Sequence, residues 1–391
     1  MEKRRARGRH MRSCSVSHWK KLNLLTGSIQ IAMTDDDYIR KIISAIESSH
    51  SVDPDVVASA AGLEPGEVGP AIRKVFLEKG FDLRAFPNYA RLGLSRVTAV
   101  LDVDRRFAGQ ADSILNGMAH WGYLVTWIKP LGGYRYVTYH AVPPSYLEDY
   151  RRLFDVMKEE GLLTGYSYYQ PRSQPEAFSY DPSVFDYWGR QWKAKPENVE
   201  VDRVLREHNS VPFSGLDELD LKIVEQLQYS ALRASDTMAR EFGVPQEEVE
   251  RHLQNHVYGE GLVLKVIVDV LDKEVIGGET GVLVCICSGG SEEGFRELKR
   301  WLLRNPNLQY LNAGSSHVEA HLYAPWRSIP FVGAVVDKKV SEVQPEVYEL
   351  EVLSADGVNA FAIPLEQFKG GMWTFSQEEA LMALRKYLRA P

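Results

Sequence analysis

Residues 218–262 read ELDLKIVEQLQYSALRASDTMAREFGVPQEEVERHLQNHVYGEGL, and residues 37–81 read DYIRKIISAIESSHSVDPDVVASAAGLEPGEVGPAIRKVFLEKGF. The two stretches align without a gap at a shift of 181 residues, and the glycine pairs Gly62/Gly243 and Gly80/Gly261 stay in register. Self-similarity at one fixed spacing indicates a repeated structural unit. We therefore predict that the chain holds two copies of one unit in tandem.

Each copy predicts three short helices. Apolar residues recur with helical period in the first and third of them. The second helix is expected to begin at Asp53-Pro54 in the first copy, with Ser235 as its cap in the second copy, and to end at Gly62 or Gly243. A glycine in the turn between the second and third helices is typical of a helix-turn-helix.

After each helical unit the sequence predicts strands and helices in the order βαββαβ. Right-handed crossovers on a four-stranded antiparallel sheet make this order a ferredoxin-like fold. Strands are expected at 97–103, 124–128, 134–141 and 163–169, and again at 281–287, 308–311, 317–323 and 346–352. Helices are expected at 107–121 and 146–160, and again at 292–303 and 329–339. The fold class is therefore α+β, with two tandem units.

The chain divides into seven expected segments. Aromatic residues at 178, 185 and 192 recur at 361, 368 and 375, and we expect both aromatic segments to pack on a sheet face or at the join between the copies. The segments are a basic, disordered tail (1–33), a helix-turn-helix (34–84), a ferredoxin-like domain (92–172), an aromatic linker (173–214), a second helix-turn-helix (215–264), a second ferredoxin-like domain (278–354) and an aromatic C-terminal tail (355–391).

Charge and cysteine content limit the class of protein. The net charge of the chain is −7, but residues 1–33 carry a net charge of +7. We expect this segment to be a basic arm that binds phosphate groups, a disordered tail, or an extension upstream of a translation start at Met33. No apolar run is long enough to span a membrane. An odd number of cysteines, three in all, favours a reducing cytoplasm. Cys285 and Cys287 share one face of a predicted strand, where they serve either as structural thiols or as a redox or metal-binding pair.

Three motifs resemble the Lrp/AsnC (leucine-responsive, feast-or-famine) transcription regulators. They are residues 216–223 (LDELDLKI), 239–244 (AREFGV) and 259–262 (GEGL), and residues 133–136 (GYRY) resemble the family's turn before its third strand. The resemblance implies a tandem-duplicated, archaeal-type member in which each winged helix-turn-helix precedes a RAM effector domain of ACT-like fold. The second copy departs from the turn motif with residues 316–319 (SHVE).

The resemblance implies binding to double-stranded DNA. A recognition helix should present basic or amide side chains to base edges and phosphates. The candidates are Arg73 and Lys74 in the first copy and Arg251, Gln254 and Asn255 in the second. Residues 243–261 nevertheless carry a net charge of −3, so one or both units could serve as packing modules in a protein-interaction protein instead.

The resemblance also implies a small-molecule effector, such as an amino acid, near the turn before the third strand. The candidates are Gly132, Gly133, Tyr134, Arg135 and Tyr136, where glycines expose backbone amides and Arg135 could hold a carboxylate. A plain β-turn with a surface arginine is the alternative. We expect an intrachain pseudo-dimer in which the two ferredoxin-like sheets face each other, with a homodimer of the chain left open.

The siroheme decarboxylases are an enzyme class that resembles the Lrp/AsnC regulators in this two-domain plan. If the chain is such an enzyme, His140, Arg135 and Tyr134 are the nearest candidates for its site residues. Glycine loops that cradle phosphate and nucleophile motifs are not found, and no cofactor is expected. His317, Glu319 and His321 share one face of a predicted strand and are weak candidates for a metal site. His252 and His256 lie four residues apart, but His256 falls near the apolar stripe, so these two are not expected to form a site.

Overall fold

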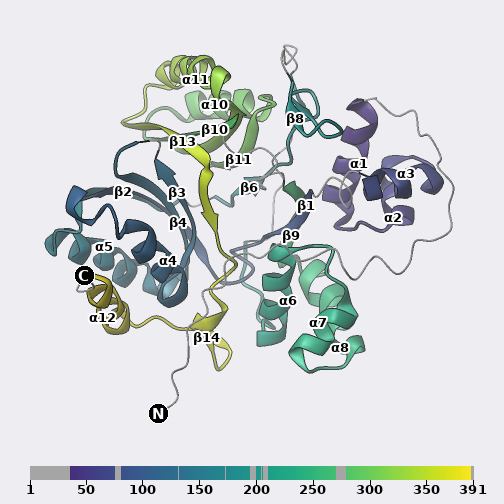
Figure 1. The fold of residues 1–391 in the computed structure, drawn as a ribbon, viewed down its shortest axis with the longest axis horizontal. Coiled ribbons are helices and arrows are strands. Elements are labelled where there is room, and N and C mark those ends of the chain that lie inside the picture. The colour runs from purple at the N-terminus through teal and green to yellow at the C-terminus, as the bar shows by residue number, and fades with distance from the viewer. Residues whose placement is uncertain are drawn as a thin grey trace.

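A computed structural model describes residues 36–74, 81–130, 132–171, 173–193, 200–203, 205, 210–269 and 279–388. The protein is a mixed α/β protein with several sheets (Figure 1). The predicted basic tail lies outside the described residues, as does the predicted end of the first copy's third helix. Among the described residues, no helix has the length and apolar character needed to cross a membrane.

The first helical unit comprises α1 (Asp36–Ser49), α2 (Pro54–Ala61) and α3 (Pro65–Ile72). The side chain of Asp53 accepts hydrogen bonds from two amides at the start of α2, because this N-cap satisfies N–H groups that have no partner within the helix. Gly62 ends α2 with φ 65°, a left-handed conformation that glycine adopts without steric cost. Both ends of α2 are as predicted.

The second helical unit comprises α6 (Glu218–Tyr229), α7 (Ser235–Phe242), α8 (Gln246–His252) and a π-helical turn, η5 (Leu253–Tyr258). Gly243 ends α7 with φ 71°, as predicted. The predicted cap at Ser235 is wrong. Ala234 occupies the N-cap position, and the Ser235 hydroxyl instead donates a hydrogen bond to Glu250 at 3.0 Å, which ties α7 to α8.

Two strands that follow the helical units pair with each other. β1 (Asp82–Pro87) and β9 (Val263–Asp269) form an antiparallel two-stranded sheet. Helix α1 packs against β9 and helix α6 packs against β1, so each helical unit lies on the strand that follows the other unit. This exchanged packing joins the N-terminal and C-terminal halves of the chain.

Nine strands form one sheet in the order β5-β2-β4-β3-β13-β10-β12-β11-β6. Along the chain, each half contributes its elements in the order strand, helix, strand, strand, helix, strand. In the sheet, the first strand of each half lies between that half's fourth and third strands. The first half has β2 (Ser95–Val103), α4 (Ala111–Trp121), β3 (Leu124–Pro130), β4 (Arg135–Val142), α5 (Leu147–Glu159) and β5 (Leu163–Tyr169). The second has β10 (Thr280–Ser288), α10 (Glu292–Leu303), β11 (Leu308–Ala313), β12 (His317–Pro325), α11 (Ile329–Val343) and β13 (Val347–Ala360).

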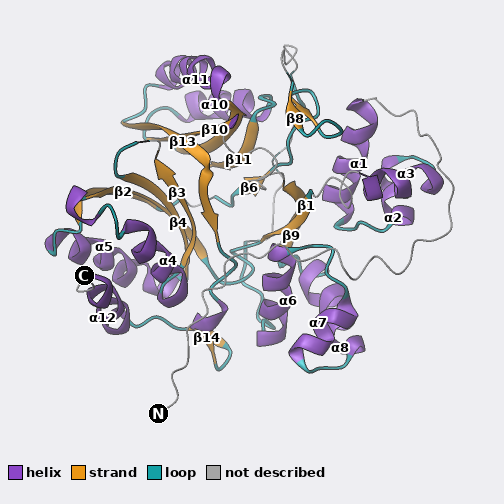
Figure 2. Ribbon diagram, viewed as in Figure 1, coloured by secondary structure: helices purple, strands orange, loops and turns teal. Residues whose placement is uncertain are grey.

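Helices cover the outer face of each half, with α4 and α5 on the first and α10 and α11 on the second (Figure 2). Alternate residues of a strand point to opposite faces. In β10, Leu283, Cys285 and Cys287 pack in the core beneath α10 and α11, whereas Val282, Val284 and Ile286 belong to the core shared with the first half. The two cysteines are buried free thiols. The inner faces of the two half-sheets therefore lie against each other.

Strand β13 is longer than predicted, because its C-terminal part leaves the second half and pairs with β3 of the first half at Val358, Asn359 and Ala360. The linker residues of β6 (Glu176–Ala177) pair with β11 in the corresponding way. The β3 edge of the first half and the β11 edge of the second are thus covered, which protects strand groups that would otherwise remain unpaired.

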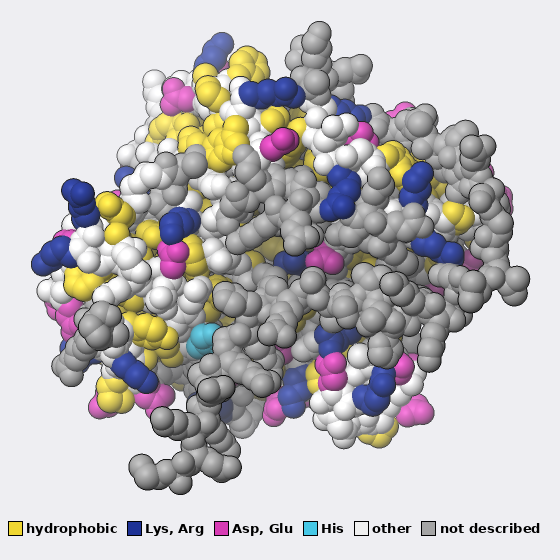
Figure 3. Space-filling view, viewed as in Figure 1, with side chains coloured by type: hydrophobic (Ala, Val, Ile, Leu, Met, Phe, Trp, Pro, Cys, Tyr) yellow, Lys and Arg dark blue, Asp and Glu magenta, His cyan; other side chains and the backbone are white. Residues whose placement is uncertain are grey.

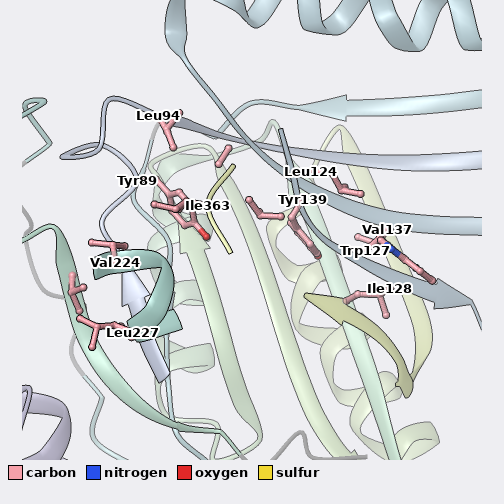
Figure 4. Close-up of a cluster of buried hydrophobic side chains, with 14 of the residues drawn as sticks. Tyr89, Leu94, Leu124, Trp127, Ile128, Val137, Tyr139, Val224, Leu227 and Ile363 are labelled. Atoms are coloured by element: carbon pink, nitrogen blue, oxygen red, sulfur yellow. The ribbon is translucent and has the colours of Figure 1, made fainter. Parts of the chain in front are cut away.

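The aromatic segments pack where the sheets and helical units meet. Phe185, in β7 (Phe185–Asp186), contacts Phe81 and Tyr180, and the short strand β8 (Gln191–Trp192) pairs with β7. Near the C-terminus come β14 (Phe368–Lys369), β15 (Met372–Trp373) and α12 (Gln377–Leu388). Figure 4 shows part of the same core, in which Ile363 lies among side chains of the first half and of α6.

Candidate functional site

A cluster of polar side chains lies between the two half-sheets. Two hydrogen bonds cross between the halves at its centre, from the Thr98 hydroxyl to Glu319 Oε2 at 2.9 Å and between the Tyr139 hydroxyl and His321 Nε2 at 2.6 Å. Six buried residues make up this group, which we call the interface cluster: Arg96, Thr98, Tyr139, Tyr310, Glu319 and His321.

Arg96 is the charged centre of the first half's contribution. Its guanidinium lies over the rings of Tyr89 and Tyr139, at 4.7 and 5.4 Å from their centroids. Burial alone would lower the pKa of Arg96, but the neighbouring Tyr310, Tyr89 and Glu319 raise it, and the net shift is upward. Within the described structure, Nε and Nη1 of Arg96 are buried without a hydrogen-bond partner.

The tyrosines of the cluster are held neutral. Burial is the main cause that raises the pKa of Tyr139 and of Tyr310, and the nearby carboxylate of Glu319 raises both further. A tyrosine with a raised pKa keeps its proton at neutral pH, so it can donate a hydrogen bond or a proton. The cluster therefore combines a buried cation, a carboxylate, neutral hydroxyl donors and an imidazole.

The residues predicted as weak metal ligands do lie on one face of β12, but their side chains have separate partners. His317 Nε2 lies 2.9 Å from the Ser173 hydroxyl, and Glu319 and His321 reach across to the first half. Glu319 and His321 are 3.6 Å apart. His317 is directed to the Ser173 side, so the three side chains do not gather around one point in the described structure.

The predicted effector turn is positioned at the edge of the same interface. Gly132 and Gly133 have φ values of 104° and 111°, and Tyr134 is exposed. The guanidinium of Arg135 is 3.0 Å from Glu349 and 2.9 Å from Glu351, both on β13 of the second half. The charge of Arg135 is therefore matched by the chain's own carboxylates.

Tyr136 and His140 point away from the interface cluster, toward the helices of the first half. The Tyr136 hydroxyl donates to Asp112 on α4 at 3.0 Å. His140 is fully buried and contacts the hydroxyls of Tyr150 and Thr138 at 2.8 and 2.9 Å. Burial lowers the pKa of His140 to about 3. His140 and Arg135 lie five residues apart in β4 and therefore on opposite faces of the strand, so these two candidates do not share a site.

The predicted DNA-contacting residues are exposed. Arg73 and Lys74 follow the last residue of α3, and the Lys74 ammonium lies 4.9 Å from the Trp188 ring centroid. Arg251 is the sixth residue of α8, while Gln254 and Asn255 belong to η5. Lys/Arg and Asp/Glu side chains are interspersed over α6, α7 and α8 (Figure 3), so this surface has mixed charge.

The histidines of the second helical unit lie together, contrary to expectation. His252 Nδ1 and His256 Nδ1 are 2.7 and 2.9 Å from the same Asp220 oxygen. His252 is buried and His256 is partly exposed, although His256 was the residue expected near the apolar stripe. Sequence reasoning did not identify Asp220. Its position three residues after the helix cap Asp217 is the pattern of a capping box and could have identified it.

No family model matches the sequence, and no curated protein matches it. Among solved structures, the siroheme decarboxylase NirDL aligns with 90% of this chain and 100% of its own, at TM-score 0.52 and 15% identity. NirDL in complex with an iron-uroporphyrin III analogue gives the same values. The neighbours also include regulators of the AsnC type over about a third of the chain, such as AsnC of E. coli (TM-score 0.27, 20% identity, 35% of this chain and 91% of its own). The likeness to NirDL establishes a shared fold.

Proposed function

We propose that the protein binds a carboxylate-bearing small molecule at the interface cluster and removes a carboxyl group from it, as a siroheme-decarboxylase-like enzyme. Arg96 carries the proposal. Nε and Nη1 of its buried guanidinium have no hydrogen-bond partner among the described residues, and a carboxylate is the group that matches a guanidinium in charge and geometry.

The remaining members of the cluster suit the reaction. Decarboxylation breaks the bond between a methylene carbon and the carboxylate, releases CO₂ and leaves the electron pair on carbon, which then takes up one proton. The Tyr139 hydroxyl is a neutral donor for that proton, and His321, at 2.6 Å, can return a proton to Tyr139. The step is redox-neutral and leaves a methyl group.

Charge limits how the substrate is held. The inner face also carries Glu319, Glu349 and Glu351, but Arg135 pairs with the last two. A carboxylate placed beside Arg96 therefore shares that cation with Glu319, which accepts a hydrogen bond from Thr98. The likeness in fold to NirDL, over nearly the whole chain, supports an acidic tetrapyrrole as the substrate class.

Titration with the iron-uroporphyrin III analogue tests the proposal, because binding shifts the tetrapyrrole absorbance. We expect Arg96→Gln to bind at least about 10-fold more weakly, since a charge-assisted hydrogen bond is lost. Arg296→Gln, at an exposed position on α10, is the matched control and should bind as the wild type does. Turnover is tested by incubation with siroheme and mass spectrometry for loss of CO₂. Absence of binding, or equal binding by Arg96→Gln, would overturn the proposal.

A second candidate function is a DNA-binding regulator of the Lrp/AsnC type with two tandem units, each a winged helix-turn-helix followed by a ferredoxin-like effector domain. Exposed Arg251, Gln254 and Asn255 on one helical segment favour it, because such side chains can read base edges. In this case the effector would be an acidic molecule at the same interface. A gel shift on the DNA upstream of its own gene distinguishes the two functions.

A further inference from the structure

We propose that the second helical unit holds a divalent transition-metal ion, with Zn²⁺ as the best match, bound by Asp217, Asp220, His252 and His256. Among the described residues, these are the ones whose ligand atoms gather within 4.8 Å of one another. Two imidazoles and two carboxylates are a donor set that zinc accepts in four-coordinate sites. The site is separate from the interface cluster and does not depend on the proposed function.

Local structure fixes the two carboxylates. Asp217 is the N-cap of α6 and Asp220 is the third residue of that helix, and they form a capping box. Asp217 Oδ1 accepts from the Asp220 amide at 2.9 Å, and Asp220 Oδ2 accepts from the Asp217 amide at 3.2 Å. These bonds leave Asp220 Oδ1 directed at the histidines.

The histidines come from the junction of α8 and η5. His252 is the last residue of α8, and His256 lies in the π-helical turn that follows, where the wider turn changes the direction of side chains. Their rings are 4.6 Å apart. Both Nδ1 atoms therefore face one carboxylate oxygen from the same side of the helical unit.

The distances fit a metal after small adjustments. Asp220 Oδ1 is 2.7 Å from His252 Nδ1 and 2.9 Å from His256 Nδ1, and Asp217 Oδ1 is 3.9 Å from His252 Nδ1. In a tetrahedral zinc site with bonds of about 2.0 Å, ligand atoms lie about 3.3 Å from one another. These three separations lie on both sides of that value, and the four ligand atoms lie within 4.8 Å of one another, so the side chains would move together to complete the site.

Electrostatics also favours a cation here. The Asp220 side chain has 0% exposure, and in the described part of the chain it forms no ion pair with a lysine or arginine. A buried carboxylate needs a compensating charge. The Asp217 side chain is 48% exposed and gives an ion a route from solvent.

Without metal, the site is a hydrogen-bond network with a defined tautomer. Arg251 Nη2 lies 3.1 Å from His252 Nε2, and a guanidinium can only donate, so Nε2 is the acceptor and Nδ1 carries the proton toward Asp220. A metal on Nδ1 displaces that proton, and Nε2 must then be protonated. Two N–H groups cannot hydrogen-bond to each other, so metal binding would free the already exposed Arg251 side chain from its contact with His252.

Cobalt titration tests the site, because tetrahedral Co²⁺ has visible absorption bands and occupies zinc sites. The full-length protein, free of any affinity tag and dialysed against a chelator, is titrated with Co²⁺ and then with Zn²⁺ as competitor. We expect one equivalent of Co²⁺ to bind and Zn²⁺ to displace it. His256→Gln and Asp217→Asn should each weaken Co²⁺ binding at least about 10-fold, because loss of even an outer-shell group costs that much.

The variants separate metal binding from folding. Asn is a good N-cap, so Asp217→Asn keeps the start of α6 while it removes the charge. His120→Gln, at an exposed position on α4, should bind as the wild type does. Circular dichroism confirms that each variant is folded. No stoichiometric Co²⁺ signal in the wild type, or an unchanged signal in folded Asp217→Asn, would overturn the proposal.

Discussion

Tyr139 and His321 are each the fifth residue of their strands, β4 and β12, and they hydrogen-bond to each other at 2.6 Å across the two half-sheets. Residues at corresponding positions meet in this way where two similar halves are related by an approximate two-fold axis. The Ser167 hydroxyl also donates to Glu349 across the halves, at 2.8 Å, and both pairs are separated by 182 residues in the chain. The interface cluster thus contains a contact between corresponding strand positions of the two halves.

We expect Tyr139→Phe to lower the free energy of unfolding by about 1–2 kcal/mol, because it leaves the buried imidazole of His321 without its hydroxyl partner. Urea denaturation measures the change. A double-mutant cycle with His321→Phe isolates the pair, and the double variant should lose less than the sum of the single variants. Additive losses would show that the two side chains do not interact.

Arg96→Met should lower the free energy of unfolding by less than Arg203→Met does, because Nε and Nη1 of Arg96 have no hydrogen-bond partner among the described residues. Arg203 is the contrast, since its guanidinium donates to the carbonyls of Asn305, Ser179 and Pro306. Arg203→Met should cost about 2–3 kcal/mol. Equal destabilisation by both variants would mean that Arg96 contributes to stability and is not kept for a ligand.

The burial of His140 predicts how stability depends on pH. Its pKa is about 3 in the folded state and about 6.5 in the unfolded state, so between these values the unfolded state binds more protons. The free energy of unfolding should therefore fall as the pH drops below about 6.5, with a loss of about 2 kcal/mol near pH 5 from this residue. His140→Gln should remove that part of the dependence, measured by urea denaturation across the pH range, while His120→Gln should retain it.

Arg251→Ala should weaken binding to the upstream DNA by about 10-fold and reduce the slope of log affinity against log salt by about 1 if Arg251 contacts a phosphate. The combined variant Arg73→Ala/Lys74→Ala tests the first helical unit in the same assay. Quantitative gel shifts at several salt concentrations give both numbers. No shift with the intact protein at low salt would count against the regulator.

Zinc should strengthen DNA binding by the wild-type protein, because an ion on His252 releases Arg251 from its contact with that ring. Asp217→Asn should bind DNA equally well with and without zinc. Fluorescence anisotropy with labelled upstream DNA measures both, with a chelator as the zinc-free reference. The same zinc effect in Asp217→Asn would place the ion elsewhere.

Local features of the chain were predictable from sequence. Asp53, Gly62 and Gly243 act through the backbone of their own neighbours, so their roles can be inferred from a few residues. Strand positions followed from alternation and short apolar runs. The limits of this reasoning appear at Ser235, where a contact with Glu250 of the next helix takes the hydroxyl away from the cap position.

Features that join distant segments were not predictable. The pairing of β3 with β13 and the gathering of Arg96 with Tyr310 both depend on how the halves dock, which no periodicity records. His252 and His256 were misjudged for a similar reason. A regular helix would place His256 near the apolar stripe, but the π-helical turn moves it, so that both rings reach Asp220.

The exchanged packing of the helical units has a mechanical consequence. Helix α1 rests on β9 and helix α6 on β1, and these strands are paired along their length. Neither unit can tilt without carrying the strand that leads into the other unit's sheet. The β1-β9 pair therefore couples the two helical units mechanically. A rearrangement between the half-sheets would move both units together and change the distance between them.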